Sequence, residues 1–136
     1  MKGYQIESYL SDSVHFNGCF SKSNLPTFPD EKKLPISLII HNNGHYVAVL
    51  LREDYCLYFD SFANKMSDLI LTYLNQKYKS AFVNLERIQD YSSYNCAYFC
   101  IAFVKNVYSI ESYNLFLNMF NNKFKKSNDE IVKTLY

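Results

Sequence analysis

Apolar residues form short runs in the first half of the chain and recur mainly at helical spacing in the second half. Three runs rich in β-branched and aromatic residues are separated by turn-forming or charged residues, a pattern typical of neighbouring antiparallel strands. These runs are residues 36–40, 45–51 and 55–60, and the turns between them are residues 41–44 and 52–54. The sequence therefore predicts a hairpin extended by a third strand.

The remaining elements follow from the same patterning. Ser67 stands where an N-cap is expected, just before a stretch whose apolar residues recur near the helical period. All three prolines fall within one polar stretch, which predicts an ordered loop there. The expected elements are helices over residues 3–10, 65–79 and 95–108, one or two helices within 110–135, a strand over 81–85 and the loop over 20–35. We expect an α+β fold, in which helices flank a mixed, mostly antiparallel sheet.

Length and charge narrow the class of protein. A chain of 136 residues has the length of one ordinary domain, so we expect a single domain over residues 1–136. Its formal net charge of +1 gives no global field that would favour a nucleic acid as the main partner. The longest uncharged run, residues 34–51, is interrupted by Asn, Gly and His, so no membrane-spanning segment is predicted.

The four cysteines are predicted to be free thiols. They stand at Cys19, Cys56, Cys96 and Cys100. Their number is too small for a disulfide framework, and no CxxC pair suggests zinc. We therefore expect no metal cofactor. Residues 1–10 lack the continuous apolar core of a signal peptide, so we expect a reducing compartment.

Four polar residues stand at the ends of predicted elements, and together they supply the groups of a thiol protease. Cys96 would be the nucleophile, His45 the proton carrier, Asp60 the group that orients the imidazole, and Gln89 a donor to the oxyanion. His45 begins one strand and Asp60 ends the next, so antiparallel pairing brings them together. Cys96 lies in the first turn of the helix expected over residues 95–108, where backbone N–H groups favour a thiolate. His41 is a rival base on the other side of the turn.

Five motifs in this order resemble the adenovirus-type cysteine endopeptidases (adenain) and the similar proteases of virophages and Polinton-type elements. They are residues 16–26 (FNGCFSKSNLP), 44–48 (GHYVA), 58–62 (YFDSF), 88–89 (IQ) and 93–100 (SYNCAYFC). Each motif is weak alone, but their order and spacing make the set specific. The resemblance covers most of the chain, from about Phe16 to Phe103.

The resemblance implies a papain-like fold of the adenain/Ulp type, with the nucleophile at a helix N-terminus. It implies an endopeptidase that cleaves viral capsid and core precursor polypeptides beside small residues during maturation, in the virion and the host cell interior. It assigns the catalytic roles to Cys96, His45, Asp60 and Gln89. Members of this family also use DNA and an activating peptide, which leaves both open here, although the lysines at 123, 125 and 126 more commonly form a solvated helix face.

Three residues depart from the family pattern. Tyr46 replaces a tryptophan beside the histidine, which keeps an aromatic wall of smaller size. Ala97 replaces the glycine after the nucleophile, which predicts a methyl group near the substrate backbone and slower turnover or narrower substrate choice. Ala63 stands where glycine often follows the acidic segment, which concerns the local turn rather than the chemistry.

Two other functions remain open. The same clan includes proteases that remove ubiquitin or SUMO, so an isopeptidase is the second enzyme hypothesis. A catalytically silent virion protein that uses the fold for binding is a hypothesis of another class, motivated by Ala97. A cysteine at a helix start among aromatic residues is usually a packed core thiol. Reactivity of the Cys96 thiol therefore separates the silent protein from both enzymes.

Overall fold

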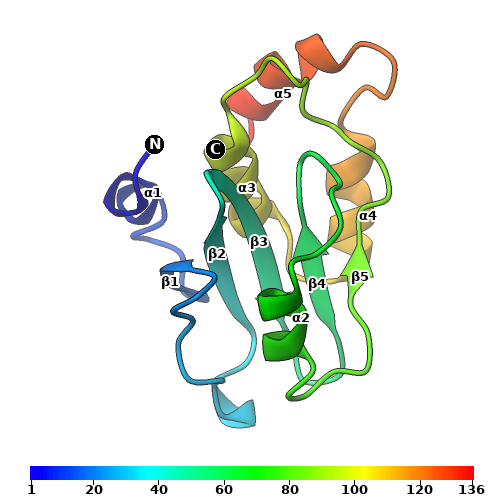
Figure 1. Ribbon diagram of the computed structural model, residues 1–136. Coiled ribbons are helices and arrows are strands. Elements are labelled where there is room, and N and C mark those ends of the chain that lie inside the picture. Colours follow the sequence, from blue (N-terminus) through cyan, green and yellow to red (C-terminus); the bar gives the residue numbers. More distant parts are fainter.

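A five-stranded mixed sheet runs through the centre of the molecule, with the strands in sequence order (Figure 1). The computed structural model describes residues 1–136. The strands are β1 (Phe16–Ser21), β2 (Ile36–Asn42), β3 (His45–Leu51), β4 (Cys56–Phe59) and β5 (Phe82–Val83). The central pairs β2–β3 and β3–β4 are antiparallel, whereas both outer pairs, β1–β2 and β4–β5, are parallel. The predicted α+β class and mixed sheet are confirmed, but the sheet is less antiparallel than expected.

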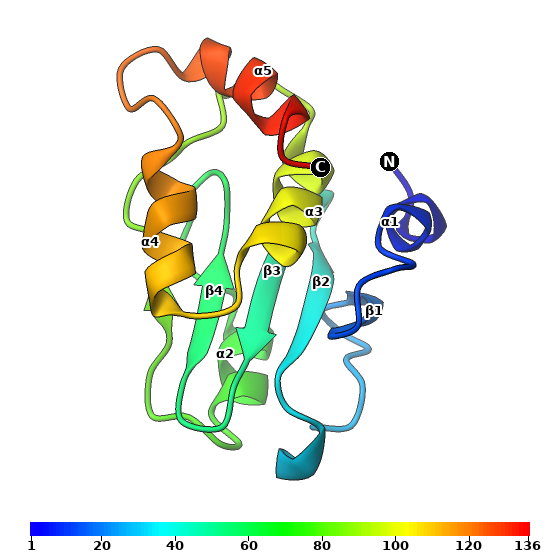
Figure 2. The same cartoon turned by 180° about the vertical axis from the view of Figure 1, so that it is seen from behind.

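Helices cover both faces of the sheet. They are α1 (Gly3–Tyr9), α2 (Asp68–Leu74), α3 (Cys96–Asn106), α4 (Ile110–Asn118) and α5 (Asn128–Lys133), with short 3₁₀ turns at Glu31–Lys33 and Lys125–Ser127. In Figure 1 α2 lies in front of the sheet and α3 and α4 lie behind it; Figure 2 shows the reverse view. Each face therefore has its own apolar core, one beneath α2 and a larger one around α3.

The predicted hairpin is confirmed, with its turn at Asn43 and Gly44. Both residues have positive φ, 52° and 79°, as a two-residue hairpin turn of type I′ requires. Asn and Gly tolerate that conformation, which explains why this short sequence is sufficient to form the turn. The hairpin places His45 at the first position of β3.

The helix that begins with Cys96 is apolar on nearly all sides. Seven of its residues are buried, so α3 is a central helix that packs on β3 rather than an amphipathic surface helix. The buried residues are Ala97, Phe99, Cys100, Ile101, Ala102, Phe103 and Val104. Its burial fixes the position of its first residue, Cys96, relative to the strand that carries His45.

Strand β1 differs most from the sequence prediction. Residues 20 and 21 were expected in a loop, but they form the end of β1, which pairs in parallel with β2. The strand carries an irregularity between Phe16 and Gly18, and Gly18 has φ +146°, so its polar–apolar alternation is broken. Strand β5 has two residues instead of the five expected. The helix predicted over 65–79 is shorter, and Ser67 is its N-cap position without a side-chain hydrogen bond.

Candidate active site

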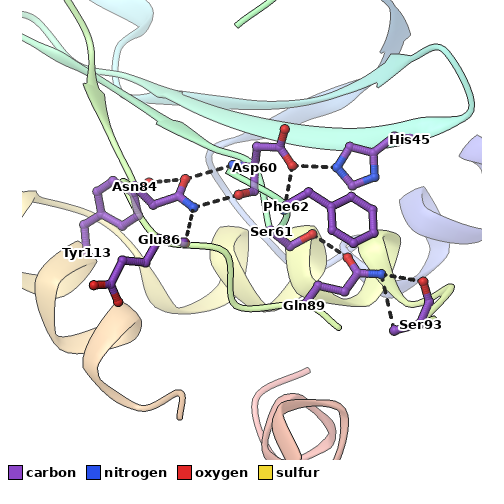
Figure 3. A network of polar contacts seen from close by, with 9 residues as sticks. All are labelled: His45, Asp60, Ser61, Phe62, Asn84, Glu86, Gln89, Ser93 and Tyr113. Carbon is purple, nitrogen blue, oxygen red and sulfur yellow. Dashed lines mark hydrogen bonds and ion pairs between the residues drawn. The ribbon is translucent and has the colours of Figure 1, made fainter. Parts of the chain in front are cut away.

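The structure brings His45 and Asp60 into direct contact. His45 begins β3, and Asp60 follows the last residue of β4, its antiparallel neighbour. The Nε2 atom of His45 lies 2.6 Å from Oδ1 of Asp60 (Figure 3). Asp60 is only 1 % exposed, so water screens this pair weakly. His45 therefore has one ring nitrogen committed to a carboxylate and the other, Nδ1, free for a second partner.

Further hydrogen bonds fix the Asp60 carboxylate and its backbone. The same Oδ1 accepts the Phe62 N–H at 2.8 Å. Asn84, which is 7 % exposed, accepts the Asp60 N–H at 3.0 Å and donates to the Asp60 carbonyl at 2.7 Å. Asn84 was not singled out from the sequence, because a single asparagine after a strand carries no local signal of such a contact. These two hydrogen bonds with Asn84 fix the backbone at the end of β4 and with it the position of the Asp60 carboxylate.

Cys96 lies beside His45, and each group shifts the pKa of the other. It is the first residue of α3 and is partly buried. Burial alone would raise the pKa of the Cys96 thiol, but hydrogen bonds with the His45 side chain and the backbone of Tyr46 and Ala97 outweigh it. The net result is a lowered pKa. These contacts stabilise the thiolate, the nucleophilic form of cysteine.

The partners of His45 stabilise its protonated form. Burial lowers the pKa of His45, but the hydrogen bonds with Asp60 and Cys96 raise it more, to about 9. A lowered Cys96 pKa and a raised His45 pKa favour a thiolate–imidazolium pair at neutral pH. Such a pair holds a nucleophile and a proton donor side by side.

The other three thiols have the opposite tendency. Burial raises the pKa of Cys19 to about 11, with a further contribution from Glu7. Burial raises that of Cys56 to about 12 and also raises that of Cys100, which lies within the core. Cys96 is thus the one cysteine whose surroundings favour the thiolate.

His41, the rival base, is not in this constellation. It pairs with Tyr46 across the β2–β3 hairpin, and the two rings lie 5.0 Å apart at 61°. His41 is exposed, whereas His45 is directed to Asp60. The strand register thus gives the two histidines different partners, Tyr46 for His41 and Asp60 for His45.

Gln89 lies close to the site but is engaged elsewhere. Its side chain is fully buried; Oε1 accepts the Ser61 hydroxyl at 2.5 Å, and Nε2 donates to the Ser93 carbonyl at 3.0 Å and hydroxyl at 3.3 Å (Figure 3). An amide nitrogen has two hydrogens to donate, and both have acceptors on Ser93. Donation to a substrate oxyanion therefore requires one of these contacts to be exchanged.

An aromatic stack continues from His45 to the surface. The ring of Phe62 lies 4.7 Å from the His45 ring at 28°, and Tyr91 stacks on Phe62 at 5.8 Å. The Arg87 guanidinium lies 3.7 Å from the centre of the Tyr91 ring, a cation–π contact. Phe62 thus restricts rotation of the imidazole, a role that the sequence motif did not reveal.

The two small-residue departures have different structural consequences. Ala97 is 3 % exposed and belongs to the core around α3, so its methyl group packs inside instead of facing a substrate. Ala63 has φ +54° in the turn after Asp60, where its N–H donates to the Asp60 carbonyl at 2.8 Å. An L-residue with a Cβ is strained in that left-handed conformation.

Replacing Ala63 with glycine is expected to stabilise the fold. Relief of left-handed strain contributes about 1–2 kcal/mol, and the greater freedom of glycine in the unfolded chain offsets about 0.4–1 kcal/mol of it. Urea denaturation of Ala63→Gly should show a higher free energy of unfolding. Ala102→Gly, within buried α3, is the matched control and should lower it. A lower free energy of unfolding for Ala63→Gly would contradict the strain argument.

The lysine run lies on the rim of a charged surface cavity. Lys123, Lys125 and Lys126 line a cavity of about 320 Å³ together with Arg87, Asp90 and Phe124. Arg87 connects this cavity to Tyr91 and so to the aromatic stack beside His45. Cations outnumber the single carboxylate in the lining, so the cavity suits an anionic group.

None of the helices is long and apolar enough to cross a bilayer. No group of three or more His, Cys, Asp or Glu side chains is arranged to hold a metal ion.

Comparison with known proteins gives no family for this chain. No model of a known protein family matches the sequence, and no curated protein matches it either.

Proposed function

We propose that the protein is a cysteine endopeptidase with Cys96 as nucleophile. The observation that carries this proposal is the His45–Asp60 contact beside Cys96, where the thiol pKa is lowered and the imidazole pKa raised. Perturbed values of opposite sense in adjacent groups are typical of catalytic sites. The papain-like fold of the adenain/Ulp type belongs to the same proposal.

The proposed reaction has two stages, the formation of a thioester on Cys96 and its hydrolysis by water. The Cys96 thiolate attacks the scissile carbonyl carbon, and the carbonyl π electrons move to oxygen to give a tetrahedral oxyanion. His45 then gives its proton to the leaving amine as the C–N bond breaks, leaving a thioester. Neutral His45 takes a proton from water, the resulting hydroxide attacks the thioester, and collapse of the tetrahedral intermediate releases the carboxylic acid and the Cys96 thiolate beside protonated His45, the starting pair. Asp60 holds His45 in the orientation that both transfers need.

Stabilisation of the oxyanion is assigned to α3 and Gln89. The Cys96 backbone N–H lies at the start of α3, where it has no partner from within the helix. Gln89 would add a second donor once its amide exchanges one contact with Ser93. Donors that act on the developing charge lower the barrier without tightening substrate binding.

The substrate class follows from the resemblance of the five motifs. We propose viral capsid or core precursor polypeptides as substrates, with cleavage during particle maturation inside the virion or host cell. An activating peptide and DNA remain proposed partners, and the charged cavity beside Arg87 is where an anionic partner would bind. No metal and no organic cofactor takes part in the proposed reaction.

Cys96 is expected to be the most reactive thiol of the four. At pH 7, iodoacetamide should modify it at least about ten times faster than Cys19, because only the Cys96 thiol has a lowered pKa. Cys19 is the internal control, since it is also partly exposed. The rates are measured by peptide mapping with mass spectrometry. Equal modification of Cys96 and Cys19 would contradict a preformed thiolate.

The function itself is tested with a proteome-derived peptide library. The wild-type protein and Cys96→Ala are incubated with the library, and new termini are identified by mass spectrometry. Cleavage of peptide bonds that depends on Cys96 is the expected result. Ubiquitin- and SUMO-linked isopeptides are incubated in parallel, and cleavage of these alone would instead support the isopeptidase hypothesis. Absence of any Cys96-dependent cleavage of either substrate would contradict both enzyme hypotheses.

A further inference from the structure

The start of α5 holds the chain segment that leads into the nucleophile. Asn128 is fully buried, and its Nδ2 donates to the Ile88 carbonyl at 2.7 Å. The next residue, Asp129, accepts the Ser93 hydroxyl hydrogen through Oδ1 at 2.9 Å. Figures 1 and 2 both show α5 near the N-terminal end of α3. Helix α5 therefore contacts the chain both before and after Gln89, at Ile88 and at Ser93.

Ser93 connects Asp129 to both Gln89 and the start of α3. Its hydroxyl donates its one hydrogen to Asp129 and accepts from Gln89 Nε2 at 3.3 Å and the Asn95 N–H at 3.2 Å. Its carbonyl accepts from Gln89 Nε2 at 3.0 Å. A hydroxyl has one donor and two acceptor positions, so all three are used. Asn95 immediately precedes Cys96.

The carboxylate of Asp129 determines which way the Ser93 hydroxyl points. Because the hydroxyl hydrogen is directed to Asp129, the lone pairs of the oxygen remain available to the Gln89 amide and the Asn95 N–H. Without that acceptor the hydroxyl would be free to rotate, and its contacts with both groups would weaken. On the other side, the Ser61 hydroxyl donates to Gln89 Oε1 at 2.5 Å, which completes the orientation of the amide plane.

We propose that Ser93 and Asp129 are positioning residues: Asp129, through the Ser93 hydroxyl, fixes the Gln89 amide and the backbone that enters Cys96. This inference rests on the proposed endopeptidase function and adds α5 to the catalytic apparatus. In the resting protein the Ser93 hydroxyl accepts a hydrogen bond from the Gln89 amide, and during the reaction the oxyanion accepts that hydrogen bond instead. The effect therefore falls on kcat rather than KM.

The test compares Asp129 with its neighbour in sequence. Glu130 is also on α5 and its carboxylate pairs only with Lys133, at 3.0 Å. With the best peptide from the library, Asp129→Ala should lower kcat about 10- to 100-fold, the range expected for a small misplacement of reacting groups. KM should stay within about twofold. Asp129→Asn retains an acceptor oxygen and should recover most of kcat, whereas Glu130→Ala should match wild type.

A second variant keeps the inference testable if Asp129→Ala folds poorly. Ser93→Ala should show the same loss of kcat, and the double variant should be no worse than Ser93→Ala, because the two residues act through one contact. Additive losses, a loss confined to KM, or equal kcat in Asp129→Ala and Glu130→Ala would overturn the inference while leaving the endopeptidase intact. Absence of any Cys96-dependent cleavage by the wild type would overturn the proposed function and the inference with it.

Discussion

Cys96→Ala is expected to abolish cleavage, with a loss of at least about 10⁴-fold in kcat. The thioester cannot form without the sulfur. His45 and the oxyanion donors remain, but no side chain is left to attack the scissile carbonyl. The side chain is partly exposed and lies at the first position of α3, so its removal should leave the packing of the helix intact. Steady-state kinetics and circular dichroism of the same preparation measure both effects.

Cys100→Ala is the matched control for this substitution. Cys100 lies one helical turn further along α3, is fully buried, and has a raised thiol pKa. Its replacement should lower the free energy of unfolding but leave kcat within about threefold of wild type, because it contacts no reacting group. Equal losses of kcat in the two variants would show that the helix, and not the Cys96 thiol, is what cleavage requires.

His45→Ala should reduce kcat/KM by about 10³-fold or more, since the leaving amine then lacks its proton donor. His41→Ala should change kcat/KM by less than about threefold, because His41 contacts Tyr46 and not Asp60. The two substitutions remove the same group on the two sides of one turn. The comparison is made with one peptide under identical conditions.

If cleavage required His41 instead of His45, the result would contradict the strand register of the hairpin. The structure pairs His41 with Tyr46 and Asn42 with His45. If cleavage survived His45→Ala but not His41→Ala, the proton carrier would have to approach Cys96 from the other strand. The assignment of Asp60 as its orienting partner would then fall as well.

The antiparallel half of the site was predictable from sequence because its determinants are local. The Asn43–Gly44 turn fixes the hairpin register, and the short charged turn after β3 returns the chain as β4. Together these place the start of β3 beside the end of β4, which brings His45 to Asp60. The apolar run after Asn95 likewise predicted a helix over residues 95–108 with Cys96 in its first turn, and α3 begins at Cys96.

The parallel edges of the sheet and the groups behind the site were not predictable in the same way. Asn84 contacts Asp60 across 24 residues of sequence, and Asp129 contacts Ser93 across 36. No periodicity or turn chemistry encodes such contacts, since they depend on how separate elements pack. Strand β1 was missed because Gly18 and its irregular pairing interrupt the alternation of polar and apolar residues.

The pH dependence of Cys96 alkylation tests the thiolate–imidazolium pair most directly. In the wild type, the rate of iodoacetamide modification should reach half its maximum below pH 9, because hydrogen bonding with His45 and the backbone lowers the pKa of Cys96. In His45→Ala the midpoint should move upward, since burial then raises the thiol pKa with less to oppose it. Coincident midpoints in the two proteins, or a wild-type midpoint above pH 9, would contradict the pair and with it the proposed catalytic mechanism.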